Sequence, residues 1–180
     1  MTTVSVGYAS NMLSVPSWNN RDIELFHGTI LPYAEDIVGV GIDVSKSRPD
    51  CDFGVGFYCT TNERQAREWA YSKAARKVQP PAVVRLTLAR PGIASLNFLA
   101  FVRGEREALD FWSPIHFFRS GGFLTNGANM STLFPYDIVF GPVALWKSQQ
   151  PMPRADQVSF HTVAAQQLLN FTATRSIISI

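Results

Sequence analysis

The chain has 180 residues, of which 46% are hydrophobic and 17% are charged, with 13 Phe and 4 Trp among them. This composition allows a sizeable core and excludes a chain that is disordered for most of its length. The formal net charge is +2 with bases and acids interleaved, so the dense basic stripe of a dedicated nucleic-acid-binding protein is absent.

No apolar run is long enough to span a membrane, and the first residues lack the basic-then-apolar order of a secretion signal. Cys51 and Cys59 cannot make a disulfide framework or a four-ligand zinc site, and His116 and His161 lack metal-ligand spacing relative to them. We therefore expect a cytoplasmic protein with reduced thiols, no metal and no membrane partner.

The N-terminal part begins with a Ser- and Asn-rich stretch, residues 1–20, which predicts a flexible arm before a single domain over residues 21–180. Alternating apolar residues predict a strand at 22–27. A helix at 33–38 follows, preceded by a proline and ended by glycines, and a polar surface loop is expected at 44–52.

The middle of the chain predicts a strand at 54–59, a helix at 62–77 capped by a polar residue, and a central strand at 83–88 with near-continuous apolar character. Spacing on the helix indicates one apolar face formed by Ala66, Trp69, Ala70 and Ala74. We therefore expect this helix to dock through Trp69.

The C-terminal part is less regular. Residues 97–118 predict one or two short helices around 105–112, and a Gly-, Asn- and Ser-rich loop follows at 120–132. Three further elements are predicted, namely strands at 136–140 and 157–162 and a closing helix at 163–170. Strands and helices alternate irregularly, which favours a mixed α+β domain.

Two stretches combine polar chemistry with glycine. His27-Gly28-Thr29 ends the first strand, and residues 52–60, Asp-Phe-Gly-Val-Gly-Phe-Tyr-Cys-Thr, place Gly56 and Tyr58 on the second. Trp69 follows Tyr58 by eleven positions. A third stretch, residues 156–162, Asp-Gln-Val-Ser-Phe-His-Thr, is a late strand that starts with a polar residue.

These stretches resemble the signature of the histidine–tyrosine–glutamate ADP-ribosyltransferases, the class of diphtheria toxin and the poly(ADP-ribose) polymerases. In that class "HG[ST]" ends the first strand and "FGxGxY" begins the second. The closer resemblance is to a small ADP-ribosyltransferase-like family of bacteria and plants. Its members read "HG", "DFGxGFYxTT…QAxxWA", "YDIVxGPVA" and "QxSFxT", and all four patterns occur here in order between residues 25 and 171.

The resemblance implies an α+β fold of two split, strongly bent antiparallel β-sheets with flanking helices, and NAD⁺ as a substrate bound between the sheets. The implied catalytic residues are His27, Tyr58 and Gln157. The implied NAD⁺-binding residues are His27, Gly28, Thr29, Gly56, Tyr58 and Trp69. Read from the residues alone, His27 can instead be a structural histidine, Tyr58 a core aromatic, and Trp69 a packing residue.

The physics of NAD⁺ cleavage fits these residue types. Gly28 has no Cβ, so its backbone can approach the nicotinamide carboxamide, and Tyr58 and Trp69 can stack on the ring. His27 can donate to a ribose hydroxyl. Gln157 stands where the class has glutamate; its amide can hold the ribose but brings no charge to the oxocarbenium-like transition state, which argues against polymer formation.

The leading hypothesis is a mono-ADP-ribosyltransferase that modifies a macromolecule, protein in preference to nucleic acid, as a toxin or effector that can be delivered into a target cell. Three alternatives stay open. They are an NAD⁺ glycohydrolase, a catalytically weak module that binds NAD⁺ or ADP-ribose, and an RNA-directed transferase.

Overall fold

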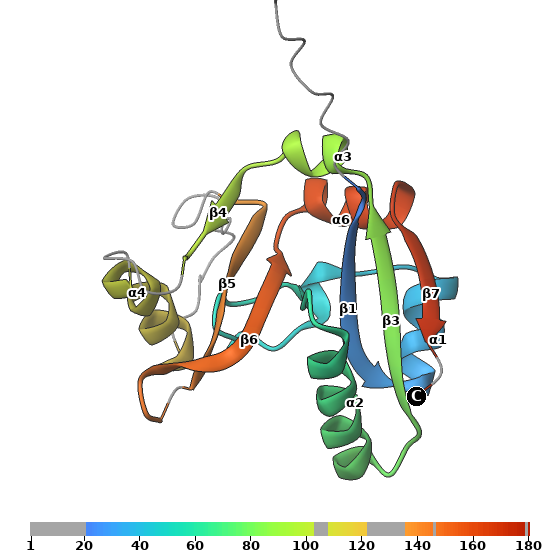
Figure 1. The fold of residues 1–180 in the computed structure, drawn as a ribbon, viewed down its shortest axis with the longest axis horizontal. Helices are drawn as coiled ribbons and strands as arrows, with labels where there is room; N and C mark the ends of the chain where they lie inside the picture. The colour runs from blue at the N-terminus through green and yellow to red at the C-terminus, as the bar shows by residue number, and fades with distance from the viewer. Residues whose placement is uncertain (1–20, 103–107, 122–135, 146, 179) are drawn as a thin grey trace, which may run out of the picture.

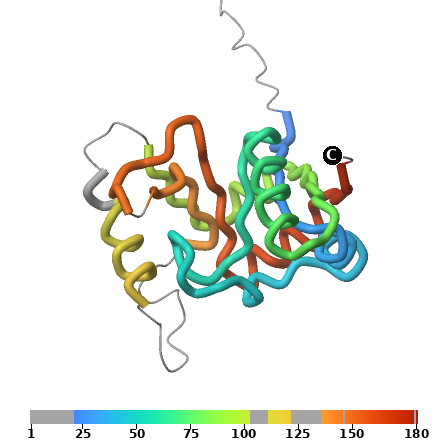
Figure 2. Tube along the Cα trace, turned by 90° about the horizontal axis from the view of Figure 1, so that it is seen from below, coloured from blue at the N-terminus to red at the C-terminus, as the bar shows by residue number. Residues whose placement is uncertain are grey.

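The structure is a computed structural model that describes residues 21–102, 108–121, 136–145, 147–178 and 180 (Figures 1 and 2). The expected N-terminal arm and most of the loop expected at 120–132 lie outside these residues. The described part contains two β-sheets and several helices, so the predicted α+β class is confirmed.

The first sheet has three antiparallel strands in the order β1–β3–β7. They are β1 (Ile23–Ile30), β3 (Pro81–Leu88) and β7 (Thr174–Ile178). The strand predicted at 83–88 is central, as its apolar pattern indicated, and Val83, Val84, Leu86 and Leu88 are fully buried. The strand β7 was not predicted, because its sequence, Thr-Arg-Ser-Ile-Ile, shows no alternation of polar and apolar residues.

The second sheet has four strands in the order β2–β6–β5–β4. They are β2 (Phe57–Cys59), β6 (Gln150–Phe160), β5 (Ile138–Leu145) and β4 (Phe98–Ala100). The β4–β5 pair is parallel, so the expectation of two purely antiparallel sheets is wrong at this edge. Strand β5 also runs past Gly141 and Pro142, where the prediction had ended it, and its register shifts between Pro142 and Ala144.

Six helices are described: α1 (Leu31–Gly39), the short 3₁₀ helix η1 (Val44–Lys46), α2 (Glu63–Lys77), α3 (Arg90–Ala94), α4 (Ala108–Arg119) and α6 (Val163–Phe171). The polar cap predicted for α2 is confirmed, since Asn62 accepts from the backbone of Gln65, and Thr162 caps α6 in the same way by accepting from that of Ala165. In both views α4 lies at the end of the molecule away from α1 and β7 (Figures 1 and 2).

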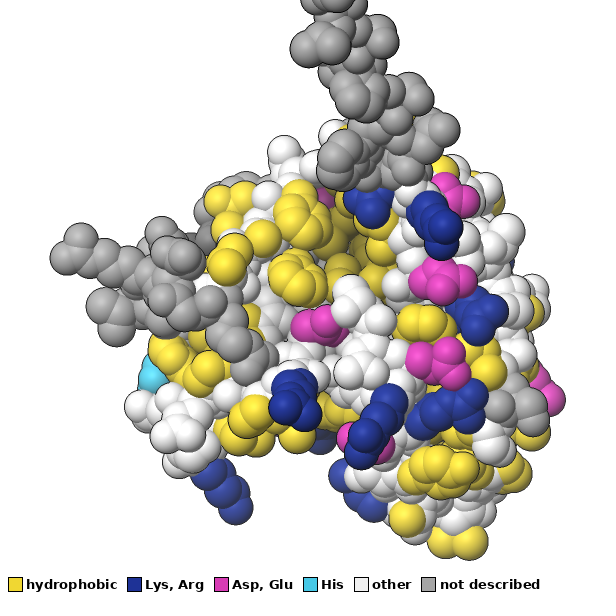
Figure 3. Space-filling model, in the orientation of Figure 1, with side chains coloured by type: hydrophobic (Ala, Val, Ile, Leu, Met, Phe, Trp, Pro, Cys, Tyr) yellow, Lys and Arg dark blue, Asp and Glu magenta, His cyan; other side chains and the backbone are white. Residues whose placement is uncertain are grey.

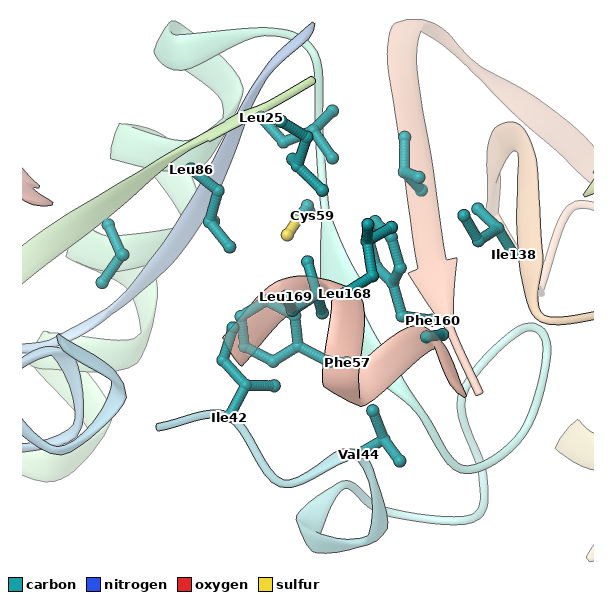
Figure 4. Close-up of a cluster of buried hydrophobic side chains, with 14 of the residues drawn as sticks. Leu25, Ile42, Val44, Phe57, Cys59, Leu86, Ile138, Phe160, Leu168 and Leu169 are labelled. Carbon is teal, nitrogen blue, oxygen red and sulfur yellow. The ribbon is translucent and has the colours of Figure 1, made fainter. Parts of the chain in front are cut away.

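The main core fills the space between the two sheets (Figure 4). Leu25 and Leu86 reach into it from the first sheet, Phe57 and Phe160 from the second, and Leu169 from α6. A second core lies on the opposite face of the second sheet; it consists of Phe53, Phe101, Phe111, Ile115, Val139 and Ala144, with Tyr58 packed against it. The second sheet is therefore covered on both faces.

Helix α2 packs on β1 and β3, but not in the predicted way. Ala66, Ala70 and Ala74 are buried, whereas Trp69 is 50% exposed. The prediction that the helix docks through Trp69 is wrong. The segment 44–52 also differs from a plain surface loop, because it contains η1 and ends in Asp52, which is only 2% exposed.

Candidate functional site

The two sheets are joined at one antiparallel bridge between Phe26 and Thr60, with backbone N–H···O distances of 2.8 and 2.9 Å. Continued in register, the next pair on this edge would be Gly28 with Tyr58. That pair does not form, since Phe26–Thr60 is an isolated bridge. The strands therefore separate at Gly28 and Tyr58, two residues that the sequence motifs had singled out.

Beyond the Phe26–Thr60 bridge, the side of β1 that faces away from β3 is unpaired, and we call this stretch, which begins at Gly28, the free edge. Gly28 presents its backbone polar groups on it. Peptide groups alternate along a strand, so the N–H and C=O of Gly28 point the same way as those of Phe26, away from β3. The hydrogen bond from Leu31 N to Pro80 O (2.9 Å) shows that the odd-numbered residues here direct their backbone groups toward β3. The even-numbered residues, Gly28 among them, therefore direct theirs away from it. Gly28 thus offers one donor and one acceptor, side by side, where the sheets separate.

Gly28 is also required by the helix behind it. A Cβ built on Gly28 would lie 2.0 Å from the carbonyl oxygen of Ala66 and 3.0 Å from the backbone nitrogen of Ala70. Only glycine allows β1 and α2 to approach this closely. The same residue therefore positions α2, and with it the exposed ring of Trp69, relative to the free edge.

His27 points to the other face of β1. Its Nδ1 lies 2.6 Å from the carbonyl oxygen of Tyr58, and its ring stacks on Phe57 with centroids 4.6 Å apart. Burial, and secondly the nearby charge of Lys73, lower the pKa of His27 from 6.5 to about 4. The imidazole is therefore neutral near pH 7.

The tautomer of His27 follows from this contact. A carbonyl only accepts, so Nδ1 carries the proton and Nε2 keeps its lone pair. The expectation that His27 donates to a ribose hydroxyl is corrected accordingly. A neutral His27 in this arrangement would accept a hydrogen bond from such a hydroxyl through Nε2.

Tyr58 lies on the face of the second sheet that carries the aromatic second core. Its hydroxyl donates to Gly54 O (2.7 Å) and accepts from Phe53 N (3.1 Å), and its ring lies perpendicular to that of His161 with centroids 6.1 Å apart. Burial raises the pKa of Tyr58 well above 10, so the phenol stays protonated. Tyr58 can therefore present a ring but not a base.

Lys73 is a cation that the motifs did not indicate. Its Nζ lies 3.4 Å from the hydroxyl of Thr29, a predicted site residue that is buried beside His27. Burial, followed by the charges of Arg76 and Arg48, lowers the pKa of Lys73. Helix α2 therefore places a cation beside Thr29.

Gln157 is buried on β6 and is held by its amide nitrogen. Nε2 donates to Asp52 Oδ2 (2.7 Å) and to Pro142 O (2.9 Å). Asp52 in turn accepts from the backbone of Ala144 at 2.9 Å and from Nε of Arg119 at 2.8 Å, and it pairs with Nη2 of the same arginine. Because both neighbours of Nε2 are acceptors, the orientation of the amide is fixed.

Gly56, predicted to bind the cofactor, has a packing reason to be glycine. A Cβ there would lie 2.6 Å from His161 Nδ1 and 2.7 Å from Phe160 O. His161 is buried and bonds Val55 O and the hydroxyl of Ser159, both at 2.8 Å, and burial lowers its pKa to about 4. This neutral histidine therefore ties the glycine-containing turn to β6.

Gly28 and Tyr58 thus lie where the sheets separate, and Trp69 is half exposed on the helix that packs against Gly28, while Thr29 and Gly56 are packed. Asp156, one residue before Gln157, is held by Thr60 and Thr61, which lie between β2 and α2. Sequence reasoning missed Asp52 and Lys73 as site residues. The only available signal for Asp52 was its place at the head of the glycine motif.

The described residues hold no group of three or more His, Cys, Asp or Glu side chains placed to bind a metal ion. None of the helices in the described ranges combines the length and the hydropathy that a membrane crossing needs. On the face shown in Figure 3, basic and acidic side chains are interspersed.

Residues 23–148 match the model of a family described as "Protein of unknown function (DUF3990)". The match spans more than two thirds of the chain and includes β1, β2, α2 and the whole free edge. The chain belongs to this family. Among curated proteins, none matches the chain.

Proposed function

We propose that this member of the DUF3990 family is a mono-ADP-ribosyltransferase that uses NAD⁺ as substrate. In the reaction, the bond between ribose C1′ and the nicotinamide nitrogen breaks, and its electron pair leaves with nicotinamide. A nucleophile of the acceptor forms the new bond to C1′ and loses a proton to solvent.

One observation carries the proposal, the N–H and C=O of Gly28 on the free edge where β1 leaves the Phe26–Thr60 bridge. A primary carboxamide needs one acceptor for its N–H and one donor for its oxygen, at the spacing that a single peptide edge provides. Nicotinamide carries such a group on a flat ring. The half-exposed Trp69 on the adjoining helix supplies an aromatic surface for that ring.

The other residues take roles that their contacts permit. His27, neutral and with a free Nε2 lone pair, would accept from a ribose hydroxyl. Lys73 would balance the negative charge of the diphosphate. Its ammonium group is partly buried near Arg76 and Arg48, so a bound anion would stabilise its charged form. Tyr58 would form the second wall of the ring site, its orientation fixed by the hydroxyl contacts with Phe53 and Gly54.

Transfer of a single ADP-ribose to a protein is favoured over growth of an ADP-ribose polymer and over transfer to nucleic acid. Gln157 has no carboxylate to activate an incoming ribose hydroxyl, which polymer elongation requires. The interspersed charges on the face in Figure 3 give no continuous basic track for a nucleic-acid backbone. An acceptor with its own nucleophile, such as a protein side chain, fits this site best.

The decisive experiment incubates the protein with NAD⁺ labelled in the adenosine part, with and without whole-cell lysate. Labelled protein together with released nicotinamide is the expected result. Free labelled ADP-ribose in both reactions would identify a glycohydrolase instead. Absence of both nicotinamide release and NAD⁺ binding would refute the proposal.

A second candidate is a module that binds NAD⁺ or ADP-ribose without turnover. The observation that favours it is the pairing of Gln157 with Asp52, which leaves the third position of the motif without a free charge. Saturable NAD⁺ binding with no nicotinamide release, with or without lysate, would select this function.

A further inference from the structure

The amide of Gln157 is committed on one side only. Both protons of Nε2 are taken, one by Asp52 and one by Pro142. Within the described residues no group donates to the amide oxygen. In the same part of the chain, Arg85 Nε is the one side-chain polar atom that is sealed from solvent and has no hydrogen-bond partner, so the Gln157 oxygen keeps some access to solvent.

Asp52 is held more firmly than a surface carboxylate. It is 2% exposed and takes four donors, namely Nε and Nη2 of Arg119, Ala144 N and Gln157 Nε2. These come from α4, β5 and β6, which makes Asp52 a fixed anion between three elements. Its position therefore does not depend on the Gln157 side chain.

We propose that Asp52 is a positioning residue, which sets the Gln157 amide with its oxygen toward the substrate and keeps a glutamine, in place of a glutamate, at this position. The inference rests on the proposed function. It assigns the negative charge of the site to Asp52, which is one hydrogen bond away from the Gln157 amide that would contact ribose.

The electrostatics explain the choice of glutamine. A glutamate at position 157 would bring a second carboxylate to within hydrogen-bond distance of Asp52 and of the Pro142 carbonyl, with no donor between them. Like charges at such a distance cannot both stay ionised unless a cation separates them. Arg119 is already engaged on the other oxygen of Asp52, and the remaining titratable neighbours, Cys51 and Tyr58, are neutral.

The experiment exchanges the two groups. Three full-length variants are compared with wild type: Asp52→Asn, Gln157→Glu and the double exchange Asp52→Asn/Gln157→Glu. Melting temperature and nicotinamide release are measured between pH 5 and 8. Asp137→Asn is the matched control, because Asp137 is also a hydrogen-bonded carboxylate, directly before β5, and it contacts Asn97 and Thr162 instead of Gln157.

Gln157→Glu alone should melt below wild type at pH 8 and recover toward pH 5, where one carboxyl is protonated and can donate to the other. The double variant should melt above Gln157→Glu at pH 8, since the amide introduced at position 52 can donate to the carboxylate introduced at position 157. Asp52→Asn should lower nicotinamide release by about tenfold, and the double variant should restore it to at least the wild-type rate.

Equal melting of Gln157→Glu and the double variant across the pH range would overturn the positioning role. Equal release by wild type and Asp52→Asn would overturn it as well. If wild type releases no nicotinamide, the proposed function fails, yet the melting comparison still decides whether Asp52 sets Gln157. Should Asp52→Asn alone not fold, the comparison of Gln157→Glu with the double variant remains decisive.

Discussion

Gly28→Ala tests the contact on which the geometry of the site depends. The new methyl group would lie 2.0 Å from the carbonyl oxygen of Ala66, where real Cβ contacts start near 3.0 Å, so the strand and helix must separate by 3.0 − 2.0 = 1.0 Å or more. The obstacle is helix backbone, which cannot rotate away as a side chain can. Overpacking of this kind costs about 1–3 kcal/mol of unfolding free energy.

The assay is urea denaturation combined with titration of NAD⁺ followed by tryptophan fluorescence. Gly28→Ala should lose stability and also bind NAD⁺ more weakly, because α2 carries Trp69 away from the free edge. Gly39→Ala is the matched control; nothing lies within 4 Å of a Cβ there, and it should be neutral or slightly stabilising. Wild-type stability of Gly28→Ala would refute the packing argument, and unchanged affinity would remove the site from this edge.

Other variants probe the same region. Trp69→Ala should leave the unfolding free energy within about 0.5 kcal/mol of wild type, because the ring is half exposed, but weaken NAD⁺ binding by about 1 kcal/mol. Tyr71→Ala, exposed on the same helix, should change neither, and equal affinities of the two variants would show that Trp69 is not a ring platform. Lys73→Gln should raise the pKa of His27, since the lysine charge is the second cause of its depression, and a histidine NMR titration that stays at wild type would contradict this. Acid should destabilise the fold, because His27 and His161 have a pKa near 6.5 in the unfolded chain but about 4 in the folded protein. Their contribution to the free energy of unfolding is complete above pH 6.5. It falls toward pH 4 by up to about 1.4 kcal/mol per pH unit for each histidine. Urea denaturation of His161→Gln should show a shallower fall over that window, and an identical slope would refute the assignment of a buried neutral His161.

Local patterns predicted the elements whose structure depends on their own residues. The helix α2 was placed by its Asn62 cap and its unbroken run, and β3 by its continuous apolar residues. The packing role predicted for Trp69 was wrong for a physical reason. The absent side chain of Gly28 brings the strand so close that Ala66 and Ala70 complete the contact, and the larger Trp69 is left at the margin.

Long-range pairing could not be obtained from the sequence. Asp52 stood in a stretch that looks like a polar surface loop, and its partners Arg119 and Gln157 lie 67 and 105 positions further along. The parallel contact of β4 with β5 also joins distant segments, and the three residues of β4 are too few to carry a pattern. The role of Gln157 as an oriented amide follows only from these contacts.

The central place of β6 has a consequence for the order in which the protein folds. Strand β6 lies between β2 and β5, which do not pair with each other, so the second sheet cannot assemble until residues 150–160 have been synthesised. Strand β7, later still, completes the first sheet against β3. During synthesis the motif residues His27, Gly28 and Tyr58 emerge early. They reach their positions in the two sheets only after the last quarter of the chain, which contains β6 and β7, has been synthesised. We expect ribosome-bound nascent chains that end before β6 to be sensitive to proteases and to depend on chaperones.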